Sequence, residues 1–173
     1  KKLFSSDLGF AATDFRRAWI SGMQRRPLII EVQPGASLFV IRFRPGGAWP
    51  FLHHDAASLT DVVHDLEAVL GASSLRDRIL SGATPADRFA LAEAWLIERA
   101  GGNLAVHPAI RHLASRLGRG RVRDLIETTG YTDRHILSLF RRHVGIAPKQ
   151  FARIQRFRGL LRSLSGGEVN PWL

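Results

Sequence analysis

The spacing of hydrophobic positions changes near residue 55. Before it, short stretches rich in β-branched and aromatic residues are separated by Gly and Pro, a pattern typical of strands. These stretches are AWISGM, PLIIEVQ and SLFVIRFRPG, at residues 18–23, 27–33 and 37–46. Pro34-Gly35 and Pro45-Gly46-Gly47 mark the turns. The first part of the chain is therefore predicted to form short strands, too few for an independent barrel.

From about residue 55 to residue 101 the apolar positions recur at threes and fours, which is the spacing of a helix face. In the first stretch they are Leu59, Val62, Val63, Leu66, Val69 and Leu70. Further on, Thr84 precedes Pro85 and Asp87, which supplies an N-cap, a proline at the first helical position and a first-turn acid. We predict a helix that runs from there to Arg99 and stops at Gly101-Gly102.

Residues 107–164 contain four further predicted helices. Pro108 begins the first, whose apolar face closes at Gly118, and the second, with Val122, Leu125 and Ile126 inward, follows a basic loop at 119–121. Gly130 suits a tight turn that needs a positive φ, and Thr132 can cap the third helix. That helix has a buried stripe of Ile136, Leu139, Phe140 and Val144, and Gly145 ends it. Pro148 starts the fourth helix, with Phe151, Ile154, Leu161 and Leu164 predicted to be buried.

Charge separates the two ends of the chain. Residues 103–173 hold 13 Lys or Arg and 4 Asp or Glu, a balance of +9, while the whole chain of 173 residues has a net charge of +10. A concentrated positive face attracts polyanions, of which nucleic acid is the most common. The outward side of the third helix carries Arg134, Leu137, Ser138, Arg141 and Arg142, and a major groove admits one such helix. The alternative is a solvated basic surface.

The segment from Val122 to Leu164 resembles the first helix-turn-helix and linker helix of AraC/XylS-type transcriptional regulators. The resemblance rests on Gly130, Tyr131-Thr132, His135, Phe140, Arg141-Arg142, Gly145 and Pro148, which stand at the family's spacing. Upstream, residues 34–52 resemble the last strands of a cupin-like sensor domain of one branch of that family, and 59–71 resemble the helix that follows. The resemblance implies DNA contacts from Thr132, Asp133, Arg134, Leu137, Ser138, Arg141, Arg142 and Lys149.

Three features depart from the family pattern. Ile126 stands where helix-turn-helix motifs usually have Ala, and Leu137 and Ser138 occupy exposed positions that commonly hold polar or Arg base readers. Direct readout then rests mainly on Arg134, with Leu137 able to contact a thymine methyl. The family also joins two helix-turn-helix units, whereas here the chain ends at Leu173. We expect the sequence to be part of a longer protein, truncated at both ends, with the second unit absent.

Other chemistry is weakly represented. His53-His54-Asp55 lacks a further cluster at ligand spacing, so we interpret it as a solvated loop rather than a metal site. His107 and His112 are interpreted as cap or surface residues, and His135 as either a helix-packing residue or a phosphate contact. With no Cys in the chain and no Ser-His-Asp set, we expect no catalytic residue, no cofactor and no enzyme activity.

We therefore predict an α+β chain in which short β-strands, the remnant of a cupin-like sensor domain, precede an all-α region with a helix-turn-helix and a long linker helix. The predicted divisions are 1–54 (sensor), 55–102 (helical linker or dimerisation region) and 103–173 (DNA-binding region). The expected function is a cytoplasmic, sequence-specific DNA-binding transcriptional regulator. The resemblance implies double-stranded DNA, a small-molecule effector, a second copy of the chain and RNA polymerase as partners, and no membrane association. The alternative is a non-enzymatic ligand-binding or protein-interaction module whose DNA binding is lost in this fragment.

Overall fold

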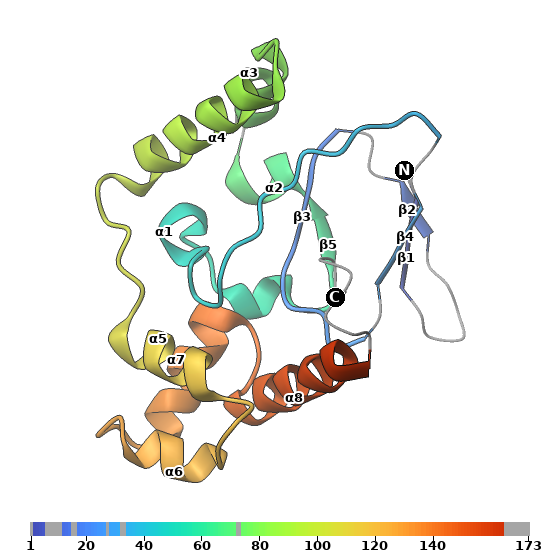
Figure 1. Cartoon of the computed structure of the whole chain (residues 1–173). Coiled ribbons are helices and arrows are strands. Elements are labelled where there is room, and N and C mark those ends of the chain that lie inside the picture. The colour runs from blue at the N-terminus through green and yellow to red at the C-terminus, as the bar shows by residue number, and fades with distance from the viewer. Residues whose placement is uncertain are drawn as a thin grey trace.

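The computed structural model describes residues 2–5, 12–14, 17–26, 28–31, 34–71 and 74–164. It is an α+β structure with the strands in the first part of the chain and most of the helices after them (Figure 1). The strands are β1 (Lys2–Ser5), β2 (Ala12–Asp14), β3 (Trp19–Ser21), β4 (Leu28–Glu31) and β5 (Val63–Asp65). The helices are α1 (Trp49–Leu52), the 3-10 helix η1 (Ala56–Leu59), α2 (Leu66–Leu70), α3 (Leu75–Ser81), α4 (Pro85–Ala100), α5 (Pro108–Arg116), α6 (Val122–Glu127), α7 (Asp133–Val144) and α8 (Pro148–Leu164).

The strands form two small antiparallel sheets. In the first, β1 lies between β2 and β4, with Leu3 opposite both Thr13 and Ile30. In the second, β3 pairs with β5, and Ile20 lies opposite His64. The predicted strands at 18–23 and 27–33 are thus present as β3 and β4.

Helices α5 to α8 pack around one apolar cluster. Its fully buried members are Ile110, Leu113, Ile136, Phe140, Phe151 and Ala152. The helix boundaries follow the sequence signals: Pro108 is at the start of α5, and Gly145 takes a left-handed conformation at the end of α7. Ile126 is buried in the same cluster, which also contains the small residues Ala109 and Ala152. At the far end of α8, Leu164 is 75% exposed, so its predicted burial is wrong because the last turn of α8 extends past the cluster.

A second apolar cluster lies between α3 and α4. Leu75, Ile79, Ala92 and Trp95 are buried there. The N-terminus of α4 has the predicted cap: Thr84 accepts a hydrogen bond from the Asp87 main-chain N–H, and the Asp87 carboxylate accepts one from the Thr84 N–H. These reciprocal bonds satisfy two donors that a helix leaves free at its start.

The strand predicted at 37–46 is wrong, because the structure has no strand in that range. Burial still alternates along it, with Phe39, Ile41 and Phe43 half-buried and the intervening residues exposed. The half-buried side chains pack on helices: Phe39 and Ile41 contact the α3–α4 cluster, and the Phe39 ring lies 5.1 Å from that of Phe89. The segment has one apolar side, but no strand of the described residues pairs with it in a ladder.

The continuous helical face predicted from Leu59 to Leu70 is also wrong. The chain forms η1, then β5, then α2. Asp61 breaks the helix with a φ of 58°, and its N–H donates to the Met23 carbonyl at 3.1 Å. The β-branched Val63 then enters the β3–β5 ladder opposite Ser21, where a branched side chain packs well.

Residues from the first part of the chain reach the α5–α8 cluster. Met23 packs against that cluster, and a Cβ added to Gly46 would lie 2.7 Å from the Ile110 Cγ2 atom. The β3–β5 ladder joins residues on either side of position 54. The three-part division at 54 and 102 stays a prediction, and the strands and the helices share packed surface across both positions.

Candidate nucleic-acid interface

The turn before α7 has the geometry that its sequence predicts. Gly130 has a φ of 71°, a backbone conformation that residues with a Cβ rarely adopt. The Thr132 side chain accepts a hydrogen bond from the His135 N–H at 3.3 Å, and Asp133 lies in the first turn, where its charge complements the helix dipole. Thr132 and Asp133 thus set the direction of α7, and both are exposed.

One side of α7 is fixed by burial. Ile136 and Phe140 are fully buried and Val144 is 5% exposed. The Phe140 ring meets the Phe151 ring of α8 edge to face, with 5.4 Å between the ring centres. Because this apolar side is held against three other helices, the orientation of the opposite side is determined as well.

The opposite side presents a stripe of Arg134, Ser138 and Arg141, spaced i, i+4 and i+7. All three residues are exposed. The stripe rises about 10 Å along the helix axis at 1.5 Å per residue, a length that fits a major groove. Leu137, at the edge of the stripe, is half-buried rather than exposed as the sequence predicted, so less of its surface is accessible to a partner.

Arg142 lies on the flank of α7 that faces α1. Its guanidinium carbon is 6.0 Å from the centre of the Trp49 ring, within range of a cation–π contact. The neighbouring His143 ring lies 4.4 Å from the same indole. Arg142 is therefore exposed but directed toward the first part of the chain, which separates it from the Arg134 stripe.

His143 is half-buried beside a hollow of about 320 Å³, which Trp49, His53 and His107 also line. Burial lowers the pKa of His143, and the nearby His107 and Arg142 lower it further, while Asp55 opposes them. Its Nδ1 atom is buried without a hydrogen-bond partner among the described residues. His143 is thus held in the neutral form over a wider pH range than a solvated histidine.

Among the remaining predicted positions, Lys149, His135, His53 and His54 are exposed, and His107 is half-buried. Lys149 lies in the first turn of α8, and His135 stacks on Tyr131 with 4.7 Å between the ring centres. His107 caps α5 by accepting from the Ala109 N–H, as predicted. His53 and His54 are exposed in the loop after α1.

The surface around α7 has few carboxylates to balance its cations. The sequence places Asp124, Glu127 and Asp133 against twelve arginines and one lysine between residues 103 and 164. Glu127 pairs with Arg123 one turn away on α6. The helical part therefore has a positive surface of the kind that attracts polyanions.

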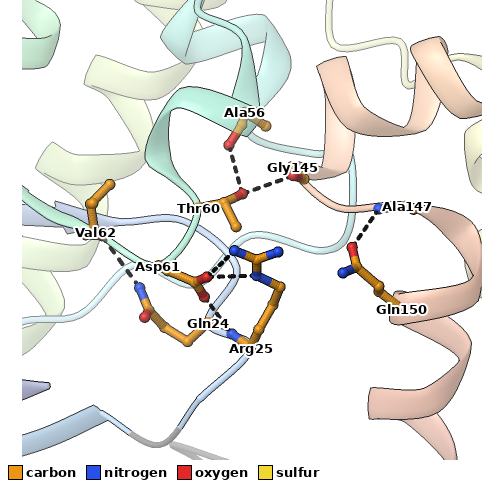
Figure 2. Close-up of polar contacts among 9 residues, drawn as sticks. All are labelled: Gln24, Arg25, Ala56, Thr60, Asp61, Val62, Gly145, Ala147 and Gln150. Carbon is orange, nitrogen blue, oxygen red and sulfur yellow. Dashed lines mark hydrogen bonds and ion pairs between the residues drawn. The ribbon is translucent and has the colours of Figure 1, made fainter. Parts of the chain in front are cut away.

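Two residues beside the stripe were not predicted from the sequence. They are Arg25, after β3, and Gln150, in the first turn of α8 (Figure 2), which line a polar cleft together with Arg141. No local pattern marks Arg25, because its relation to α7 depends on how η1 and β5 fold back.

The chain was compared with family models, curated proteins and solved structures. Residues 4–65 match the model of a domain of unknown function, DUF6597. No curated protein and no solved structure matches the chain. The matched range includes β3, η1 and β5, and so ends just before α2. Among the described residues, no helix has the length and apolar character needed to cross a membrane.

Proposed function

We propose that the chain is a sequence-specific DNA-binding transcriptional regulator of the AraC/XylS type, in which α7 enters the major groove of double-stranded DNA. The observation that supports this proposal is the division of α7 into two sides. Ile136 and Phe140 anchor one side in the α5–α8 cluster, and Arg134, Ser138 and Arg141 stand exposed on the other. Guanidinium groups on a groove-sized helix can read guanine edges and neutralise phosphates.

The roles within the stripe differ by position. Arg134 lies in the first turn of α7, and the N-terminal residues of a recognition helix contact base edges. Arg141 lies in the last turn and contacts the phosphate backbone. Ser138, between them, accepts from or donates to either partner.

The other proposed partners come from the family resemblance alone. They are a small-molecule effector bound by the first part of the chain, a second copy of the chain and RNA polymerase, with action in the cytoplasm. The sequence also predicts an apolar face around Leu59, Val62, Leu66 and Trp95 that packs either on the strands or on a second copy of the chain. Leu59 and Trp95 of this face are buried within the chain, while Val62 is 38% exposed. A second copy would therefore need a different surface.

The experiment that tests DNA binding is a salt titration with selected duplexes. Arg134→Ala is expected to relax preference at one base pair, with a cost of about 1 to 3 kcal/mol if the arginine grips guanine with both donors. Arg141→Ala is expected to weaken all duplexes alike. Arg76→Ala, on α3, removes the same charge far from α7 and is expected to leave binding unchanged.

The same titration separates the alternative function. A ligand-binding or protein-interaction module without DNA binding would show no salt-dependent affinity for any duplex. If Arg134→Ala lowers the affinity for all DNA sequences equally, Arg134 contacts the DNA phosphate backbone and not a base.

A further inference from the structure

The C-terminal end of α7 is joined to the first part of the chain by close contacts (Figure 2). The Thr60 hydroxyl, just after η1, donates to the Gly145 carbonyl at 2.8 Å. Gly145 has a φ of 99°, and a Cβ there would lie 2.6 Å from the Thr60 Oγ1 atom and 2.8 Å from the Ala56 carbonyl oxygen. The two segments are thus packed without space for a side chain between them.

Beside this contact is a polar cleft of about 250 Å³. Its lining includes Arg141 from α7 and Gln150 from α8. Arg25, after β3, and Thr60, after η1, line its other side. Arg141 is the last member of the exposed stripe that begins at Arg134. The cleft is therefore a continuation of that stripe beyond the end of α7.

Arg25 is held in place at this cleft by Asp61. The Arg25 N–H donates to Asp61 Oδ1 at 2.7 Å, and its Nε and Nη2 atoms donate to Oδ2 (Figure 2). Burial opposes ionisation of Asp61, but the hydrogen bonds from the Arg25 side chain and main chain outweigh it and hold the Asp61 pKa below its usual value. Among the described residues no acceptor is found for Nη1, which leaves that end of the guanidinium available.

We propose that this cleft binds a backbone phosphate of the DNA between Arg141 and Arg25, so that the first part of the chain contributes to the DNA interface. A phosphate at the end of α7 satisfies the geometry, because a helix seated in the major groove has the sugar-phosphate strands at its flanks. Arginine forks bind phosphate oxygens with charge-assisted hydrogen bonds. Asp61 occupies the Nε and Nη2 atoms of Arg25, so the Nη1 end is the part of the guanidinium left to bind a phosphate.

The proposal rests on the proposed function, and its test is a double-mutant cycle on duplex binding. Arg25→Ala and Arg141→Ala are each expected to weaken binding on the order of tenfold at low salt, equally for every sequence. The double variant should lose less than the product of the two single losses, because both arginines hold one phosphate. Arg17→Ala, an exposed arginine near α3, is the charge-matched control and should bind as the parent protein does.

A second variant separates a phosphate contact from support of the loop. Asp61→Asn removes the ion pair but keeps Arg25, so its DNA affinity should be retained or increased. If Asp61→Asn weakens binding as much as Arg25→Ala does, Arg25 acts only through the loop and the proposal is wrong. Wild-type affinity in Arg25→Ala would exclude a DNA phosphate at this cleft.

A measurement with inorganic phosphate tests whether the cleft binds a phosphate group of DNA or a free phosphate-bearing ligand. Thermal unfolding is followed in phosphate and in chloride at equal ionic strength, without DNA. If the parent protein binds no duplex, the proposed function fails. In that case phosphate-specific stabilisation that both Arg25→Ala and Arg141→Ala abolish would assign the cleft to a free phosphate-bearing ligand, and its absence would overturn the phosphate site altogether.

Discussion

Replacing Gly145 by alanine tests the close contact between η1 and the end of α7. The added methyl group has two costs. The left-handed backbone at a φ of 99° disfavours any residue with a Cβ by about 1 to 2 kcal/mol. The Cβ would also overlap Thr60 Oγ1 at 2.6 Å and the Ala56 main-chain oxygen at 2.8 Å, and relieving such an overlap costs about 1 to 3 kcal/mol. The expected loss in the free energy of unfolding is about 2 to 5 kcal/mol.

Gly130→Ala is the matched control for this substitution. Gly130 also has a positive φ, of 71°, but a Cβ there would meet no atom within 4 Å. Only the backbone cost applies, so its expected loss is about 1 to 2 kcal/mol. Thermal unfolding by circular dichroism measures both variants, and in a domain of this size each kcal/mol lowers the Tm by about 2 to 4 °C.

One result of comparing these two variants would contradict the packing of η1 on Gly145. Equal losses would mean that η1 does not approach Gly145, and the placement of Thr60 and Arg25 beside α7 would then be wrong. A Gly145→Ala variant that loses more and regains part of the loss when Thr60 is also changed to Ala would support the packing, because the second change removes one of the two overlapping atoms.

Three other predictions concern the helical part. Phe140→Ala should lower the free energy of unfolding by about 3 to 5 kcal/mol in denaturant titrations. Phe157→Ala, at a side chain that is 57% exposed, should change it by less than about 1 kcal/mol. Equal effects of the two substitutions would refute the burial of Phe140. Thr132→Ala should lower the free energy of unfolding by about 1 kcal/mol through loss of the α7 cap. Thr132→Ser keeps the capping hydroxyl and should leave the free energy of unfolding close to that of the parent protein. Because the folded pKa of His143 lies below its ordinary value of 6.5, the unfolded chain binds a proton first as pH falls, so stability should decline below about pH 6.5. His143→Phe should reduce that decline in unfolding experiments between pH 7 and pH 5, and an unchanged pH dependence would count against it.

The helices of the second part could be predicted because their signals are local. The boundaries of α4, α5, α7 and α8 depend on a capping residue, a proline or a glycine within one turn of the helix end. The buried stripe of Ile136, Phe140 and Val144 follows from helical periodicity. These properties need no knowledge of a distant partner.

The first part of the chain could not be predicted to the same extent, because its structure depends on distant partners. Residues 37–46 have the alternation of a strand, and whether such a segment joins a ladder depends on a neighbouring strand, not on its own residues. The apolar spacing from Leu59 to Leu70 fits a helix, but the bonds of Asp61 to Arg25 and Met23 impose a turn. Arg25 was not predicted as part of the candidate interface for the same reason, because it is far along the chain from Arg141 and only the fold brings the two residues to one cleft.

The packing of Met23 against the α5–α8 cluster has a consequence for how the protein would respond to a ligand. Met23 contacts that cluster, and its carbonyl accepts from Asp61, which also holds Arg25. We therefore expect strand β3 and helix α7 to open to solvent together, which hydrogen exchange of their main-chain amides would measure. A small molecule that binds near β3 could favour either the state in which α7 is packed on the cluster or the state in which it is open. The shift would equal the difference in its affinity for these two states, and no separate moving linker would be needed.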